Sequence, residues 1–339
     1  MSVLHRLPPL ATTGVGSLPF SDPAEAVRHA RRAYALPFCP QLPQRDGDMV
    51  REWLGSDPCR CGWTPERDRE LPTAWHAFLA TREDEWPEHR VVKLQVTGPV
   101  TLAVALEQAA GRPGIGTPVR ALAREIADWL AANVAGQVAG LREHDLDAVV
   151  VVDEPGLAHA VGGGLEAEVW DPLRAVGAAW GLHVCSAVPW ELVRAADPDL
   201  VSFDATRYAV GGAGASVLGD LISRGARVAW GVVDPVDPGH PDDVAACLSA
   251  AIGAVVAAGV PVSTVFAHSL VTPSCGTGRL APDRERLVAA LVEAGAAVAA
   301  STWRGWPAAA DPRRAGLGDR RAGQPGGSDF SDSLARWRG

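Results

Sequence analysis

A histidine and a cysteine alternate in the short stretch Leu182 to Ser186, which reads Leu-His-Val-Cys-Ser. The stretch lies between two segments with helical patterns, which predicts a strand of an α/β protein. Residues i and i+2 of a strand point to the same face, so the imidazole of His183 and the thiol of Cys185 are expected to lie side by side. Nitrogen and sulfur donors suit zinc, and the pair predicts half of a zinc site.

Apolar runs and helical patterns alternate along the whole chain. Strands are predicted at 12–18, 36–42, 91–97, 148–153, 182–186, 200–204, 228–233 and 262–268, and the helical segments between them include 23–35, 118–143, 166–180, 189–196, 214–224, 241–258 and 283–300. This number of β-then-α units is typical of a (β/α)₈ TIM barrel, with a doubly wound sheet as the alternative. The segment from Gln44 to His89, after the second strand, is too long for a simple connection and predicts an elaborated loop excursion over one end of the barrel.

Composition sets the outer bounds of the interpretation. The chain has 339 residues, is 47% hydrophobic and has a formal net charge of −9. A barrel domain is expected over 1–305, and the polar, glycine-rich segment 306–339 is expected to be a disordered tail. The acidic balance argues against a nucleic-acid or anionic-membrane surface. With neither a membrane-length apolar run nor a signal sequence, the expected location is the cytoplasm.

Six cysteines in such a chain are more typical of thiols or metal ligands than of disulfides. Cys39 and Cys247 are expected to be small core residues. Cys59 and Cys61 form half of a metal-binding pattern without a partner pair, so exposed free thiols are expected there. This leaves Cys185 and Cys275 as the candidate ligands.

In a parallel barrel the functional residues follow the carboxyl ends of the strands. Cys275 follows the last predicted strand and supplies a second thiolate, and Asp204 ends the strand after His183 and Cys185 and supplies an oxygen. These four residues predict a zinc site with an exchangeable position. The alternatives are that His183 and Cys185 are inward core residues and that Asp204 is a helix N-cap.

Five motifs together resemble the catalytic barrel of cobalamin-independent methionine synthases, over about residues 10 to 300. They are Thr13-Gly14-Val15-Gly16-Ser17-Leu18-Pro19, Gly98-Pro99-Val100-Thr101, Asp153-Glu154-Pro155-Gly156-Leu157, His183-Val184-Cys185 and Pro273-Ser274-Cys275-Gly276, in the order of that family. The Asp-Glu-Pro core of the third motif is also compatible with a simple strand-ending turn.

The resemblance implies a function and roles for individual residues. Zinc on His183, Cys185, Cys275 and the acidic residue Asp204 would bind the homocysteine thiol as a thiolate, which then attacks a methyl group. Gly16 and Ser17 would hold the carboxylate of the amino acid. Asp153 would pair with its ammonium group, with Glu154 beside it among the substrate-binding residues.

The chain also departs from the pattern of that family. The family has Glu where Asp204 stands, and Pro43 and Gln44 occupy the place of an acidic substrate-binding residue. The family's Asp-Ile-His run, whose His is a proton donor, corresponds to Asp234-Pro235-Val236, so Asp234 and the nearby His240 are the catalytic candidates here. The folate-binding half of the full-length enzymes has no counterpart, so the methyl donor is expected to be a folate or a methylated corrinoid protein.

Three functions follow from these observations. The first is a zinc-dependent methyltransferase that converts homocysteine to methionine. The second keeps the barrel but uses corrinoid-dependent methyl transfer, or the decarboxylase chemistry of uroporphyrinogen decarboxylases, which needs no zinc. The third is a zinc-binding or amino-acid-binding barrel without catalysis, suggested by the departures at Pro43 and Val236.

Overall fold

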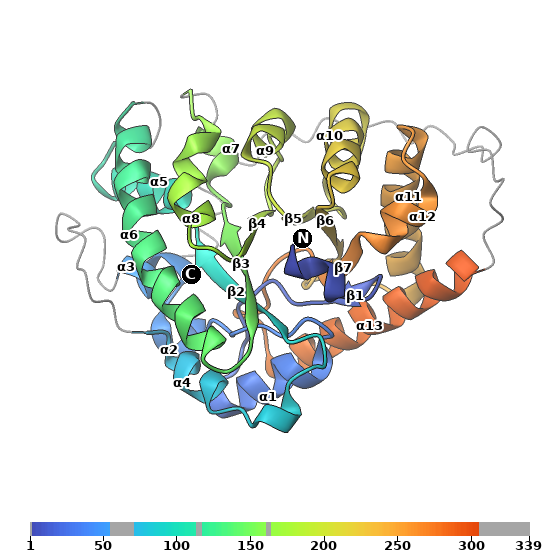
Figure 1. Ribbon diagram of the computed structural model, residues 1–339, viewed down its shortest axis with the longest axis horizontal. Helices are drawn as coiled ribbons and strands as arrows, with labels where there is room; N and C mark the ends of the chain where they lie inside the picture. The colour runs from blue at the N-terminus through green and yellow to red at the C-terminus, as the bar shows by residue number, and fades with distance from the viewer. Residues whose placement is uncertain (1, 55–70, 113–116, 161–163, 305–339) are drawn as a thin grey trace.

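The computed structural model describes residues 2–54, 71–112, 117–160 and 164–304. Seven parallel strands form one curled sheet, and helices surround it (Figure 1). The strands are β1 (Ala11–Thr12), β2 (Val91–Thr97), β3 (Asp147–Asp153), β4 (Ala179–Val184), β5 (Leu200–Asp204), β6 (Arg227–Val233) and β7 (Ser269–Pro273), in the order β1-β7-β6-β5-β4-β3-β2. The predicted α/β barrel architecture is thereby confirmed.

The helices alternate with the strands and cover the outside of the sheet (Figure 1). They are α1 (Pro23–Ala33), α2 (Pro43–Asp46), α3 (Met49–Leu54), α4 (Thr73–Leu79), α5 (Pro99–Ala109), α6 (Thr117–Arg142), α7 (Leu157–Ala160), α8 (Asp171–Arg174), α9 (Trp190–Ala196), α10 (Gly212–Ser223), α11 (Pro241–Ala257), α12 (Val262–Ala267) and α13 (Pro282–Arg304), with 3₁₀ turns η1 (Val3–Arg6), η2 (Glu83–Glu85) and η4 (Ala167–Trp170). Within the described part of the chain, none of them has both the length and the hydropathy that crossing a membrane requires.

The predicted second strand, 36–42, does not form a regular ladder. It makes two isolated parallel bridges, Ser17 to Gln41 on one side and Phe38 to Lys93 on the other. Backbone hydrogen bonds from Cys39 to Lys93 (3.0 Å) and from Leu18 to Gln41 (2.9 Å) reinforce these bridges. This segment therefore closes the ring between β1 and β2.

Two hydrophobic clusters follow from the alternation of side chains along the strands. In β4, Leu182 and Val184 belong to the large cluster between the sheet and the helices, whereas His183 lies on the opposite, inward face. A smaller cluster fills the interior near the strand starts, where Leu4 and Leu7 from the N-terminal turn pack against it. The interior is therefore filled at its amino end, and the polar residues collect at the carboxyl end.

The first predicted strand, 12–18, is shortened to β1, and two further predicted elements were wrong. The β-branched run 262–268 is helix α12, which follows Pro261, and the strand is the next segment, β7, whose residues are all buried. The predicted helix 166–180 is only η4 and α8, because Gly177 adopts a positive φ of 79° and the chain turns into β4 at Ala179. The tail 306–339, together with Cys59 and Cys61, lies outside the described residues.

Candidate active site

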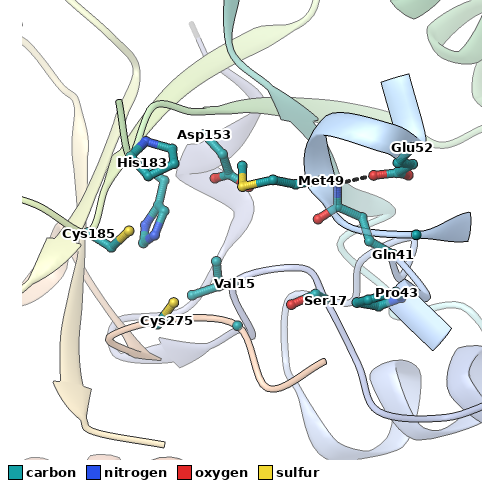
Figure 2. Close-up of a pocket in the computed structure, with 13 residues that line it drawn as sticks. Val15, Ser17, Gln41, Pro43, Met49, Glu52, Asp153, His183, Cys185 and Cys275 are labelled. Atoms are coloured by element: carbon teal, nitrogen blue, oxygen red, sulfur yellow. Dashed lines mark hydrogen bonds between the residues drawn. The ribbon is translucent and has the colours of Figure 1, made fainter. Parts of the chain in front are cut away.

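A pocket of about 490 Å³, measured out to solvent, opens at the carboxyl ends of the strands. Its lining comes from the loops after β1, β3, β4 and β7 and from the excursion before β2. Figure 2 shows His183, Cys185 and Cys275 at one end of the pocket and Gln41 and Glu52 at the other. The pocket therefore has a sulfur- and nitrogen-rich end and an end rich in oxygen.

His183 is held as a neutral imidazole with one nitrogen available. Its ring is 3% exposed, and Nδ1 lies 2.9 Å from the Ser202 hydroxyl, whereas the buried Nε2 has no hydrogen-bond partner. Burial lowers the pKa of His183 to about 3, and the positive charge of Lys93 acts in the same direction. When Nδ1 donates to Ser202, the lone pair of Nε2 is free for a ligand bond, which is the tautomer a metal-binding histidine needs.

Cys185 and Cys275 are hydrogen-bonding neighbours although 90 residues separate them in the sequence, because β4 and β7 both end at this rim. The hydrogen bond from Cys185 lowers the pKa of Cys275, and the Gly276 backbone helps. The same contact, with burial, raises the pKa of Cys185. The two thiols therefore titrate as a pair, in which the remaining S–H group stabilises the first thiolate that forms.

Asp204, the fourth predicted ligand, is engaged in its own turn and does not line the pocket. Its Oδ1 accepts hydrogen bonds from the Thr206 backbone (2.9 Å), the Thr206 hydroxyl (2.6 Å) and the Arg207 backbone (3.1 Å). Within the described ranges, no three His, Cys, Asp or Glu side chains stand together as a ready-made metal site. The chemistry of His183, Cys185 and Cys275 fits a zinc ion, and their assembly around one remains a prediction.

Ser17 lies on the pocket wall and is tied to the loop that carries Cys275. Its backbone oxygen accepts hydrogen bonds from the Thr277 backbone (3.1 Å) and hydroxyl (3.3 Å), and its hydroxyl accepts one from Gly278 (3.3 Å). A Cβ on Gly276 would lie 2.1 Å from Ser17 Oγ, so glycine is required there for this packing. Gly16 lies behind Ser17, outside the pocket lining.

Asp153 ends β3, lines the pocket and is 5% exposed. Its Oδ1 accepts a hydrogen bond from the amide of Gln95, and Gln95 in turn accepts one from Lys93 at 2.6 Å. Burial raises the pKa of Asp153, and Lys93 and Gln95 oppose that shift. Burial also lowers the pKa of Lys93 to about 7, against the attraction of Asp153. Lys93 and Gln95 were not anticipated from the sequence.

Glu154 is placed as a structural residue rather than a substrate-binding one. It is fully buried and accepts hydrogen bonds from the backbones of Val100 (3.1 Å) and Thr101 (2.8 Å), from the Thr101 hydroxyl (2.7 Å) and from Trp170 Nε1 (2.9 Å). It thus satisfies the first backbone donors of α5 and does not line the pocket. A carboxylate with four donors in place has its hydrogen-bonding capacity used.

Glu52 is an acidic pocket residue that the sequence reasoning missed. Asp48 caps α3 by accepting from the backbones of Val50 (3.0 Å) and Arg51 (2.9 Å). Positions i and i+3 of that helix, Met49 and Glu52, then face the pocket together. Gln41 donates to Glu52 at 2.6 Å, the contact drawn dashed in Figure 2. An N-cap residue at Asp48 predicts a helix that begins at Met49. This signal could have placed the acidic pocket residue at Glu52, after Met49, rather than before Asp48.

The predicted catalytic pair, Asp234 and His240, does not line the pocket. Asp234 pairs with Arg207 at 3.2 Å and accepts from the Val236 backbone at 2.9 Å. His240 is exposed and caps α11, with its Nδ1 accepting from the Asp242 backbone at 3.4 Å. As the structure stands, both residues shape loops beside the barrel mouth.

The remaining cysteines in the described ranges lie apart from the pocket. Cys39 is buried in the large cluster, and Cys247 packs against it from a partly buried position. Neither lines the pocket, and both are free thiols. Their placement agrees with the expectation of small core residues.

No protein-family model matches the sequence, and no curated protein matches it. Among solved structures, the chain is similar to a B12-independent methionine synthase from Shewanella sp. W3-18-1 in complex with selenomethionine, with 14% identity and a TM-score of 0.57 over 88% of this chain and 100% of that chain. It is also similar to a methyltransferase from Methanosarcina mazei, with 13% identity and a TM-score of 0.49 over 89% and 97% of the two chains. At these identities the first likeness shows a shared fold.

Proposed function

We propose that this chain is a zinc-dependent methyltransferase that transfers a methyl group to the thiol of homocysteine and forms methionine. The observation that carries the proposal is the sulfur- and nitrogen-rich end of the pocket: a neutral, buried His183 with an unpartnered Nε2, beside two neighbouring thiols. The Shewanella protein, a methionine synthase in complex with selenomethionine, supports the same class of ligand.

His183, Cys185 and Cys275 would hold the metal, and the fourth position would be open to substrate. Zinc at this point would supply the acidity that converts a bound thiol to a thiolate near pH 7. Asp204 would keep its turn in place beside the site. The donor set of one nitrogen and two sulfurs is soft enough to favour zinc over magnesium or calcium.

The oxygen-rich end of the pocket suits the head group of an amino acid. Glu52 lies at this end and Asp153 lies nearer His183, and the carboxyl group of either can pair with an ammonium group. The Ser17 hydroxyl can donate to a carboxylate. Met49 and Pro155 also line the pocket, with Met49 next to Asp153 in Figure 2, and they would contact the methylene carbons of the substrate.

The reaction in this arrangement is a displacement at carbon. The sulfur of homocysteine loses its proton to solvent and forms a bond to the methyl carbon, while the bond from that carbon to the donor breaks. The donor keeps the electron pair, and a folate donor also takes up one proton at the nitrogen that carried the methyl group. The pocket residues orient the thiol and exclude bulk water, which raises the fraction of productive encounters. The donor is a methylated folate or a methylated corrinoid protein, entering from the open side of the pocket.

The deciding experiment measures metal content in protein purified without added zinc. We expect one zinc per chain in the wild type and its loss in Cys185→Ser and Cys275→Ser. Cys247→Ser is the matched control, because Cys247 is a partly buried thiol outside the pocket and should leave zinc in place. Zinc that is absent from the wild type, or retained in both pocket variants, contradicts the proposal.

Activity then separates the remaining functions. Homocysteine should release a proton on binding, and methionine should form from methyltetrahydrofolate or from methylcobalamin. Methionine from only one donor identifies the donor class. Homocysteine binding with no methionine from either donor would instead indicate the non-catalytic binding protein.

A further inference from the structure

A buried lysine lies beneath the pocket and contacts its wall directly at Val15 and, through Gln95, at Asp153. Lys93, on β2, is 3% exposed. Its Nζ donates to the backbone oxygen of Val15 and, at 2.6 Å, to Oε1 of Gln95. It also lies over the Phe38 ring, 5.0 Å from the centroid. Lys93 and Gln95 do not line this pocket but line a smaller cavity that adjoins it, since Val15 and His183 line both. They reach the pocket wall through their hydrogen bonds to Val15 and Asp153.

Lys93 fixes the orientation of the Gln95 amide. An ammonium or amine group at Nζ offers donors, so the oxygen of Gln95 must face it. The NH₂ group of Gln95 then faces the other way and donates to Oδ1 of Asp153. One oxygen of Asp153 is thereby occupied from below, and the carboxylate is held with its other oxygen for the pocket.

The same two side chains support the loop that carries Ser17. Val15 and Ser17 are two residues apart on this loop, and the carbonyl of Val15 is bound by Lys93. Gly16 packs directly on Gln95, because a Cβ at Gly16 would lie 2.7 Å from Gln95 Cγ. A change at Lys93 therefore reaches both ends of an amino-acid head group, whereas a change at Gln95 that keeps the length of the side chain preserves the packing on Gly16 and acts mainly on Asp153.

We propose that Lys93 and Gln95 are positioning residues for amino-acid recognition: Gln95 aims Asp153 at the ammonium group of the ligand, and Lys93 orients Gln95 and anchors the Ser17 loop. This inference rests on the proposed function and adds to it the residues that select an α-amino acid over a simple thiol. Lys93 and Gln95 affect the binding of the amino-acid head group, whereas methyl transfer depends on the end of the pocket that holds His183, Cys185 and Cys275.

Three small ligands test it without any methyl donor. L-methionine carries both charged groups, 4-(methylthio)butanoate lacks the amine, and 3-(methylthio)propylamine lacks the carboxylate. Binding is measured by calorimetry on the full-length protein as purified. We expect the wild type to prefer methionine over the butanoate by about tenfold or more, the usual size of one charge-assisted contact.

Gln95→Met keeps the length of the side chain and removes both amide contacts. It should abolish the preference for methionine over the butanoate while leaving the affinity for the butanoate within about threefold of wild type. Lys93→Met should weaken the binding of all three ligands, because it also releases the Val15 carbonyl. Gln95→Leu serves as a second variant if Gln95→Met does not fold. Gln137→Leu, at a glutamine buried in α6 outside the pocket, is the matched control and should behave as wild type.

The outcomes distinguish this inference from the proposed function. If the wild type binds none of the three ligands, the proposed function fails first. If the wild type prefers methionine and folded Gln95 variants keep that preference, the positioning role is overturned while the function stands. Equal weakening of all ligands in Gln95→Met and in the Gln137→Leu control would show a general loss of stability and would also overturn it.

Discussion

Gly98→Ala should be among the most destabilising single substitutions at this barrel rim. Gly98 caps α5 with a φ of −71°, which any residue can adopt, so backbone strain is not the reason. A Cβ there would lie 2.1 Å from Cδ and 2.2 Å from Oε1 of Glu154. Because Glu154 is fully buried and held by four hydrogen bonds, it has no room to yield.

The magnitude follows from the contacts that the added methyl group displaces. Moving the carboxylate breaks at least two charge-assisted hydrogen bonds, each worth about 1.5–3 kcal/mol, so the free energy of unfolding should fall by about 3–6 kcal/mol. For a chain of this size the melting temperature should fall by about 5–10 °C. Gly136→Ala is the matched control: its Cβ would meet nothing within 4 Å on helix α6, and alanine there should stabilise by about 0.5–1 kcal/mol.

Urea unfolding of a double-mutant cycle isolates the cause. In a Glu154→Ala background the obstructing carboxylate is gone, so adding Gly98→Ala should cost less than about 1 kcal/mol further. An equal cost of Gly98→Ala in both backgrounds would refute the steric reasoning. A Glu154→Ala protein with wild-type stability but lost ligand binding would restore Glu154 to the substrate-binding residues.

Three further predictions concern the pocket. Asp204→Asn should retain zinc, because the carboxylate serves its own turn, and loss of the metal on mass spectrometry would make Asp204 a ligand. Gly276→Ala should turn the Ser17 hydroxyl away and weaken methionine binding by about tenfold, with unchanged affinity for 3-(methylthio)propylamine as the contrast. The pKa of Lys93 is lowered from 10.5 to about 7 in the folded protein. Between these pH values the unfolded chain carries a proton on Lys93 that the folded protein has lost, so the free energy of unfolding should rise with pH, by at most about 1.4 kcal/mol per pH unit. Lys93→Met should flatten this rise in denaturation curves, and an unchanged slope would contradict it.

The barrel could be predicted because its strands carry a clear signal. Five of the predicted strands, from 91–97 to 228–233, overlap β2 to β6, since buried parallel strands are continuous apolar runs between helices. The run 262–268 was misread because β-branched composition does not distinguish a short helix from a strand. The strand is formed by the next segment, Ser269–Pro273, because its tertiary contacts outweigh the local preference.

The candidate site was predictable only where strand position fixes the side chain. His183, Cys185, Asp153 and Cys275 share the pocket because the carboxyl ends of parallel strands meet at one rim. Glu52 was missed because its place depends on how an irregular excursion folds back over the barrel. Glu154 was predicted to bind the substrate because the sequence does not show which of the adjacent acids Asp153 and Glu154 faces the pocket and which one accepts hydrogen bonds from the start of a helix.

The strands do not pair regularly all the way round the barrel, and one wall of the pocket lies where the regular pairing is interrupted. Between β1 and β2 the barrel is joined by isolated bridges rather than by a ladder, and Ser17 and Gln41, which form one of those bridges, are both part of the pocket wall. The opposite wall, with Asp153 and His183, stands on paired neighbouring strands. A ligand held between them therefore contacts irregularly paired segments on one side and a regular ladder on the other. Because Ser17 is hydrogen-bonded to Thr277 and Gly278, any movement of 14–18 would also reach the loop that carries Cys275.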